Sequence, residues 1–225
     1  SGYITNNIID LKTDYYNQKL QIKNISIKEC MLYNVLFLAI GVFCSLFIGH
    51  QASILLYSLL LPLLYLYNYY LKGYPLIGNM VVSFLLGMVF IITEVVINST
   101  YHIMLFPAIF AFCLSFIREV SKDLEDYPGD MKENHKTLPI ILGKEKTIYF
   151  ILLCVILLFI FFYIHAYLTS QSSLYLLSLT ILIQIPLLYS LFLLVKFFKN
   201  SQIYRLPRLY KIVTINGLII ILLMK

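Results

Sequence analysis

The chain has 225 residues, of which 60% are hydrophobic and only 12% charged, and its formal net charge is +6. Its mean hydropathy is +0.85, whereas soluble domains contain about 45–50% apolar and about 25% charged residues. This composition excludes an ordinary soluble domain and indicates an integral membrane protein.

Successive apolar runs of roughly 17–25 residues predict helices that satisfy their own backbone hydrogen bonds across the membrane. The expected fold is an all-α, polytopic transmembrane helix bundle with about seven complete spans, preceded by the end of another helix before Asn6. The predicted complete spans are residues 29–48, 52–71, 79–97, 101–118, 147–168, 173–195 and 209–224.

The start of the chain, SGYITNNIID, has no initiator Met, basic region or small-residue cleavage site, so it does not resemble a signal peptide. We therefore expect an N-terminally truncated fragment. Residues 1–225 have no linker, low-complexity tract or evident repeat, which predicts one membrane domain.

Connections that contain basic residues alternate along the chain with connections that contain none. Three connections, around residues 49–51, 98–100 and 169–173, contain no Lys or Arg, and sixteen of the seventeen positive charges fall on the other side. The positive-inside rule makes that side cytoplasmic, in what we expect to be the cell inner membrane. The positive charge then reports topology rather than nucleic-acid binding.

Cysteine, histidine and tyrosine carry little functional signal here. The four cysteines are scattered through apolar spans without paired spacing, which predicts packing residues rather than disulfides or metal ligands. His50, His102 and His165 lie toward the side opposite the acids. The tyrosines at 65–70 sit where a span meets the interface, as in an aromatic belt.

Six of the eleven carboxylates fall within residues 119–133. Asp123, Asp126 and Asp130 would share an arc of about 60° on a continuing helix. Like charges on one face destabilise a helix unless a cation binds them. Pro128 and Gly129 are expected to distort or end the helix between the last two aspartates.

A second cluster lies at the start of the chain, where Asn6, Asp10 and Asp14 recur every four residues. The predicted topology places both clusters at the cytoplasmic end. Carboxylate and amide oxygens suit Mg²⁺, which commonly bridges protein carboxylates to substrate phosphates, so the paired clusters predict a diphosphate site. The alternative is that these aspartates only solvate a loop and balance nearby lysines.

Basic residues around the acids fit the same chemistry. Lys72, Arg118, Lys122 and Lys136 could contact phosphate oxygens and stabilise charge on a departing diphosphate. Each could instead be an interfacial cation that only sets topology. Glu94 stands alone inside an apolar run and is a functional candidate by default, with no partner evident.

Three motifs together resemble the signatures of the UbiA superfamily of intramembrane prenyltransferases. They are Asn6, Asp10 and Asp14 as NxxxDxxxD, YNYYLKGYPLIGN at 67–79, and REVSKDLEDYPGDMKENHKTLPIILG at 118–143. The resemblance covers nearly the whole chain and implies a nine-helix fold of which roughly one and a half N-terminal helices are absent.

The resemblance implies roles for individual residues. Both aspartate motifs would hold Mg²⁺ against a prenyl diphosphate, with Tyr67 and Lys72 near the diphosphate and Arg118 and Lys136 flanking the second motif. The predicted metal ligands are Asn6, Asp10, Asp14, Asp123, Asp126 and Asp130. The predicted catalytic residues are Asp10, Asp14, Lys72, Asp126 and Asp130, and the predicted diphosphate contacts are Asn6, Tyr67, Lys72, Arg118, Lys122 and Lys136.

The second motif looks most like the branch of geranylgeranylglycerol-phosphate geranylgeranyltransferases, which prenylate a glycerol-phosphate derivative. Two features depart from the family pattern. The first motif is followed by lysines and no arginine, which leaves the contact of that arginine in question. Asn134 and His135 stand where a glycine often precedes the KTLP element.

The expected reaction is Mg²⁺-dependent transfer of a prenyl group, geranylgeranyl by the branch resemblance, to a glycerol-phosphate lipid acceptor, with release of diphosphate. The partners implied are a polyprenyl diphosphate, the acceptor and membrane lipids, with no obligate protein partner. An aromatic acceptor of quinone biosynthesis is the main alternative. A transporter, a structural protein and a phosphotransferase acting on a nucleotide-linked alcohol are the others, and the last lacks its Asp-Gly-x-x-Ala-Arg pattern here.

Overall fold

A computed structural model of the chain describes residues 4–5, 27–72, 74–98, 102–169, 171–196 and 205–222. Every regular element in these ranges is helical. In chain order the elements are α3 (Ile27–Ser45), α4 (His50–Leu55), η1 (Leu56–Leu60), α5 (Leu61–Leu66), η2 (Tyr67–Leu71), α6 (Ile77–Asn98), α7 (Leu105–Lys132), α8 (Leu138–Leu142), α9 (Lys144–Leu168), α10 (Ser173–Leu179), η3 (Thr180–Gln184), α11 (Ile185–Lys196) and α12 (Arg205–Ile221).

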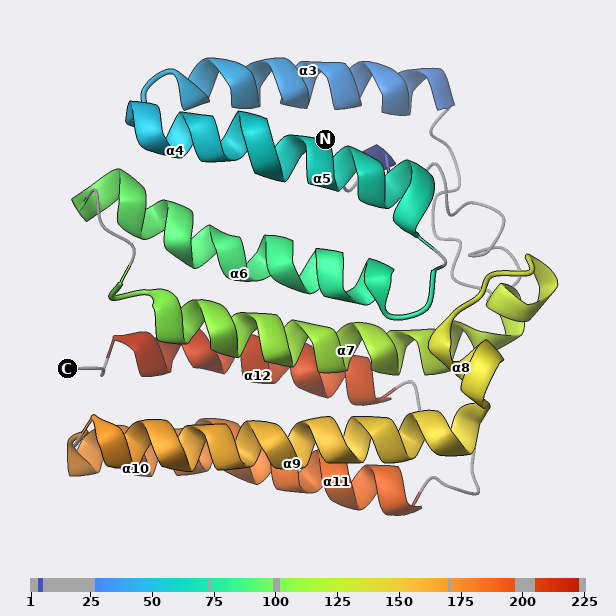
Figure 1. The fold of residues 1–225 in the computed structure, drawn as a ribbon, viewed down its shortest axis with the longest axis vertical. Helices are drawn as coiled ribbons and strands as arrows, with labels where there is room; N and C mark the ends of the chain where they lie inside the picture. Colours follow the sequence, from blue (N-terminus) through green and yellow to red (C-terminus); the bar gives the residue numbers. More distant parts are fainter. Residues whose placement is uncertain are drawn as a thin grey trace.

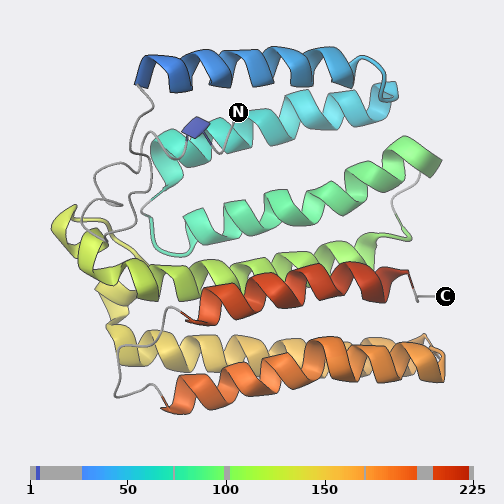
Figure 2. The same cartoon turned by 180° about the vertical axis from the view of Figure 1, so that it is seen from behind.

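The long helices lie side by side with their axes roughly parallel or antiparallel, and short connections join them at two opposite ends (Figure 1). Helix α7 occupies the middle of the array and contacts α6, α12 and α9. The reverse view shows α12 beside α7 and α11 beside α9 (Figure 2). The array therefore places one end of α7 close to the ends of neighbouring helices.

Five helical stretches within the described ranges are long and apolar enough to cross a membrane: Lys28–Ser45, His50–Leu71, Ile77–Asn98, Lys144–Leu168 and Ser173–Lys196. Five of the predicted spans correspond to them within a few residues. The predicted spans at 101–118 and 209–224 fall on α7 and α12, which run alongside the others (Figure 1). The all-helical membrane fold is confirmed, and the count of seven spans plus a partial one stays a prediction.

Two of these stretches are not uniform α-helices. The π-helical turn η1 precedes Pro62. The π-helical turn η3 precedes Pro186. A proline has no N–H and its ring clashes with the carbonyl four residues earlier, so a wider turn accommodates it inside a helix. The span at 50–71 ends in a third π-helical turn, η2.

The buried side chains repeat every three or four residues along each central helix, so each helix presents one stripe to its neighbours. On α9 this stripe is Ile148, Ile151, Val155, Leu158 and Phe162. Helix association inside a membrane depends on close packing, because lipid is as apolar as the side chains. Gly87 of α6 illustrates this: a Cβ there would lie 2.8 Å from the carbonyl oxygen of Ala108 on α7.

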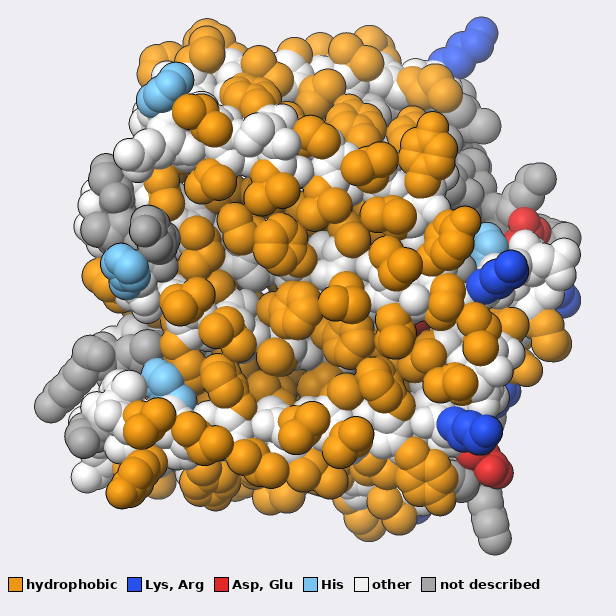
Figure 3. Space-filling view, viewed as in Figure 1, with side chains coloured by type: hydrophobic (Ala, Val, Ile, Leu, Met, Phe, Trp, Pro, Cys, Tyr) orange, Lys and Arg blue, Asp and Glu red, His pale blue; other side chains and the backbone are white. Residues whose placement is uncertain are grey.

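Apolar side chains also cover the outside of the array, in a broad band with the charged groups at one end and most of the visible histidines at the other (Figure 3). Many large apolar residues, such as Leu32, Tyr163 and Leu188, are more than half exposed. This band is the surface expected to face lipid.

Candidate active site

The second aspartate motif lies on the charged half of α7. The helix continues through Pro128 to Lys132, so of the two expected effects of Pro128 and Gly129, distortion or an end of the helix, the end does not occur. A proline within a helix removes one hydrogen bond, and the bond from Glu133 N to Gly129 O (3.1 Å) closes the last turn. Asp123, Asp126 and Asp130 therefore occupy one continuous helix.

Asp123 is bound to the neighbouring helix. Asn79, at the start of α6, donates a hydrogen bond from Nδ2 to Asp123 Oδ2 at 2.8 Å. Asp123 lies beyond the apolar half of α7, and burial raises its pKa to about 7, although the Asn79 bond opposes this shift. The charges of Asp130 and Glu119 raise it further.

The backbone of the motif at residues 67–79 positions Asn79 beside Asp123. Gly78 packs against the backbone that ends η2, where an added Cβ would lie 3.1 Å from Leu71 O. Leu76, in the preceding turn, has a φ of 63°, a strained conformation for a branched side chain. Asn79 was not among the predicted site residues; the signal in the sequence was an amide side chain at the end of the motif at residues 67–79, and the structure shows that it is buried.

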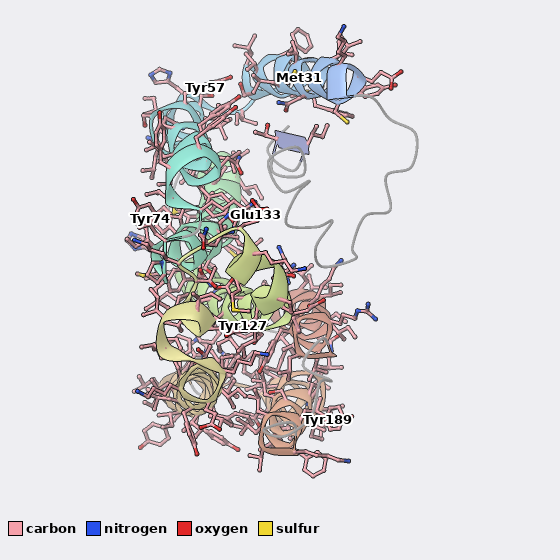
Figure 4. The ribbon with its side chains drawn as sticks, turned by 90° about the vertical axis from the view of Figure 1, so that its right-hand side faces the viewer. Met31, Tyr57, Tyr74, Tyr127, Glu133 and Tyr189 are labelled. Carbon is pink, nitrogen blue, oxygen red and sulfur yellow. The ribbon has the colours of Figure 1, made fainter. Side chains whose placement is uncertain are left out.

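Asp130 lies at the end of α7 where the chain turns toward α8. It is 5% exposed, and its Oδ1 lies 3.5 Å from Nδ1 of His135. Asn134 allows the turn because it adopts a φ of 56°, which asparagine tolerates better than most residues. Lys136, predicted to contact diphosphate, is exposed next to this turn. Figure 4 looks onto this end of the array, where Tyr127 and Glu133 are labelled.

A cavity of about 420 Å³ lies between the span at 50–71, α6 and α7. It brings together three predicted diphosphate contacts, Tyr67, Arg118 and Lys122. Glu119 also lines it and pairs with Arg118. The remaining lining residues are Leu64, Asn68, Val82, Leu85, Leu86, Val89 and Ser115.

This cavity is polar at one end and apolar along its walls. Arg118 and Lys122 are one turn apart on α7, and the apolar lining residues of α6 repeat at the spacing of one helix face. A π-helical turn, η2, places Tyr67 and Asn68 on the same cavity. Lys72 follows directly as its C-terminal cap and is partly buried. Such an arrangement suits a ligand with an anionic head and an apolar tail.

The structure describes only some of the predicted metal ligands. Asn6, Asp10 and Asp14 lie outside the described residues. Among the residues that are described, no three His, Cys, Asp or Glu side chains are grouped so as to hold a metal ion. The donor chemistry of the α7 aspartates nevertheless fits Mg²⁺, because Asp123 and Asp130 repel one another and present carboxylate oxygens.

Glu94, the acid that stood alone in the sequence, has a structural role at the opposite end of α6. Its carboxylate accepts hydrogen bonds from the backbone N–H groups of His102, Ile103 and Met104, at 2.8–2.9 Å. These N–H groups precede α7, and a negative charge there also favours the helix dipole. Glu94 therefore caps this helix start through backbone partners that no side-chain pattern shows, and a further role of Glu94 in function stays a prediction.

Comparison with known proteins decides the family. Residues 1–210 match the UbiA prenyltransferase family. The chain belongs to this family. The predicted family resemblance and the predicted class of enzyme, a prenyltransferase, are thereby confirmed.

Several relatives within the UbiA family share one name, digeranylgeranylglyceryl phosphate synthase. The protein of Methanosphaera stadtmanae is 27% identical over 94% of this chain and 78% of its own length. That of Methanococcus vannielii is 30% identical over 95% of this chain and 76% of its length. That of Methanobrevibacter smithii is 32% identical over 64% of this chain and 54% of its length.

A solved structure of digeranylgeranylglyceryl phosphate synthase also resembles this UbiA-family chain. It is 30% identical, and the superposition has a TM-score of 0.67 and covers 98% of this chain and 78% of that one. Together with the apolar stretches that can cross a membrane, the family places this protein in a membrane.

Proposed function

We propose that this chain transfers a prenyl group, geranylgeranyl by the relatives' shared name, from an allylic diphosphate to a glycerol-phosphate lipid and releases diphosphate. The observation that carries the proposal is the cavity whose cations, Arg118 and Lys122, adjoin an apolar wall from α6. Family membership supports prenyl transfer, and the relatives named digeranylgeranylglyceryl phosphate synthase support the lipid acceptor.

The chain's own residues bind the diphosphate head of the donor and stabilise its charge. Arg118, Lys122 and Tyr67 bind diphosphate oxygens, and Lys72 and Lys136 add positive charge at the same end of the array. As the bond between the prenyl carbon and the diphosphate breaks, negative charge grows on the diphosphate. Groups already aimed at those oxygens stabilise that charge without reorganising.

The apolar wall serves the tail of the donor. Val82, Leu85, Leu86 and Val89 offer a surface along which an isoprenoid chain lies, between helices that also contact lipid. Excluding water from this region protects the allylic cation from capture by solvent. Only an acceptor that enters the same cavity would then react with the cation.

Divalent cations are a general requirement for diphosphate binding in the UbiA family. In this chain the oxygens of Asp123, Asp126 and Asp130, with Asn6, Asp10 and Asp14 of the first motif, would hold Mg²⁺. When bound, Mg²⁺ neutralises diphosphate charge and polarises the bond that breaks. The carboxylates position the donor's head so that its first prenyl carbon lies toward the apolar wall.

The site faces the cytoplasm under this proposal. The acidic half of α7 lies at the end of the array where the lysines and arginines of the described residues gather (Figure 3), and the positive-inside rule assigns such an end to the cytoplasm. Soluble prenyl diphosphates and glycerol-phosphate headgroups would reach the site from that side.

The test is a transfer assay on the purified chain in lipid nanodiscs, with labelled geranylgeranyl diphosphate and two acceptors offered in competition. One acceptor is a geranylgeranylglycerol phosphate and the other a hydroxybenzoate-type aromatic. We expect label in the ether lipid, loss of transfer with a chelator and recovery with Mg²⁺. Label in the aromatic product would replace the acceptor, and transfer that resists the chelator would contradict the metal site.

The matched variants are Asp126→Ala and Glu125→Ala, adjacent on α7. We expect Asp126→Ala to lower the transfer rate about a hundredfold, which is the effect of removing one group that stabilises a transition-state charge. Glu125→Ala should stay within a few fold of the wild type. Equal rates for the two variants would contradict the assignment of Asp126.

A further inference from the structure

Two residues of the cavity carry buried oxygens that have no hydrogen-bond partner. Asn68 is 4% exposed and its Oδ1 is unpaired, and Ser115 is 1% exposed and its Oγ is unpaired. Both residues line the same cavity, from η2 and α7 respectively. A buried polar group without a partner costs about 1–3 kcal/mol, so its persistence indicates that something else pairs with it.

Ser115 differs from other buried serines on the helices around it. Ser83 on α6 donates to Asn79 O at 2.6 Å, and Ser121 on α7 donates to Ile117 O at 2.8 Å. Each satisfies its hydroxyl within its own helix, the usual solution for serine in a membrane helix. The hydroxyl of Ser115 makes no such bond, although its helix offers the same carbonyl four residues back.

The positions of Ser115 and Asn68 along the cavity indicate which part of a ligand they would contact. Ser115 lies three residues before Arg118 on α7, about 4.5 Å along the helix axis and away from its charged end. Asn68 follows Tyr67, a predicted diphosphate contact, on η2. Asn68 and Ser115 therefore lie where the cationic end of the cavity gives way to the apolar wall, which is the level of the first prenyl carbon of a bound donor.

The donor itself cannot satisfy Asn68. An ionised diphosphate has only acceptor oxygens, which the cations of the cavity pair with, and an isoprenoid tail has no hydrogen-bonding group. An amide oxygen can only accept a hydrogen bond. The missing partner must bring an N–H or O–H group to the level of the first prenyl carbon.

We propose that Asn68 and Ser115 bind the reacting hydroxyl group of an alcohol acceptor. Asn68 Oδ1 accepts the hydrogen bond of that hydroxyl, and Ser115 Oγ donates to its oxygen. This orients the oxygen lone pair toward the first prenyl carbon. The inference rests on the proposed function and deepens it, because it assigns recognition of an alcohol to this chain's own residues and makes them acceptor-binding residues.

The bonds balance without a further reagent. The bond from the first prenyl carbon to the diphosphate oxygen breaks, its electron pair leaves with the diphosphate, and the acceptor oxygen then forms a bond to the resulting allylic cation. The hydroxyl proton passes to an oxygen of the departing diphosphate. Asn68 and Ser115 hold the hydroxyl and take no proton.

The experiment compares Asn68→Leu and Ser115→Ala with Ser115→Thr, which keeps the hydroxyl, and with Ser121→Ala as the control on the same helix. Michaelis constants are measured separately for geranylgeranyl diphosphate and for geranylgeranylglycerol phosphate. We expect Asn68→Leu and Ser115→Ala to raise the acceptor constant about three- to tenfold, the worth of one hydrogen bond. The donor constant should change less than twofold, and Ser115→Thr should recover much of the loss.

A second measurement does not depend on turnover. Calorimetric titration of the same alcohol into the chain without donor should give a dissociation constant that rises by a similar factor in Asn68→Leu and not in Ser121→Ala. A rise confined to the donor constant, equal rises in both constants, or alcohol binding unaffected by Asn68→Leu would overturn the inference. If the wild type transfers only to an aromatic carbon, the proposed acceptor fails, and alcohol binding that is still lost in Asn68→Leu would separate the two results.

Discussion

At the scale of single residues, the structure places amide groups from neighbouring helices at the candidate site. Asn79 holds Asp123 in place at 2.8 Å, and Asn68 lines the cavity beside Tyr67. The acids could be predicted because their spacing on α7 is visible in the sequence. Asn79 could not be paired with Asp123 in advance, because 44 residues separate them and only the packing of α6 on α7 joins them.

The pKa of Asp123 predicts how stability depends on pH in the protein freed of metal by a chelator. The folded protein holds a proton on Asp123 between the ordinary pKa of 3.8 and about 7, whereas the unfolded chain releases it. Because the folded state binds the extra proton, its free energy of unfolding falls as pH rises through this range. We expect Asp123→Asn, which is neutral throughout, to reduce this slope.

Melting temperatures in detergent between pH 5 and pH 8 measure the effect. Glu125→Gln, two residues along and on another side of α7, is the control and should keep the wild-type slope. A slope in Asp123→Asn as steep as in the wild type would show that other groups cause it.

At the scale of elements, the two ends of α7 carry different groups. Its first end is capped by Glu94 from α6, and its last half carries the aspartates and the cations of the cavity. The span at 50–71 contributes through a π-helical turn, which rotates Tyr67 and Asn68 relative to a regular helix. Apolar runs predicted where these helices lie, but the π-helical turns and the cap depend on backbone geometry.

Removing the Glu94 cap should weaken the fold and spare the chemistry. Glu94→Ala removes the shared acceptor of three partly buried backbone hydrogen bonds, and we expect a loss of about 1–3 kcal/mol in the free energy of unfolding. The site is about 28 Å away along α7, from Met104 to Asp123. Transfer per folded molecule, assayed well below the melting temperature, should therefore stay within twofold.

Thr93→Ala is the matched control for this variant, because Thr93 donates only to Val89 O of its own helix and is exposed. Its melting temperature should remain near that of the wild type. Normal stability in Glu94→Ala combined with lost transfer would instead support a functional role for Glu94.

At the scale of the whole molecule, the array separates a charged end from an end with histidines across a band of apolar side chains (Figure 3). Opposite ends of the same helices therefore serve different purposes. The charged end holds the predicted diphosphate site, and the opposite end holds the cap of α7. This separation is what a membrane enzyme needs when its substrate has a polar head and a lipid-soluble tail.

The cytoplasmic position of the charged end can be tested in intact cells. In a chain without its four cysteines, Gln51→Cys and Lys144→Cys place single thiols at exposed positions at opposite ends of the array. A membrane-impermeant maleimide should label residue 51 directly and residue 144 only after permeabilisation. The reverse pattern would place the site on the outer side.

Composition, apolar periodicity and the distribution of positive charge determined that this chain is a helical membrane protein, and motif spacing indicated its family and its acidic site. These properties depend on residues close in sequence, because helix periodicity and charge patterns are local. Only the tertiary structure decided which side chains meet: Asn79 with Asp123, Glu94 with the start of α7, and Asn68 and Ser115 in one cavity. These contacts depend on how the helices pack. Helix packing in turn depends on the shapes of many side chains that are far apart in the sequence.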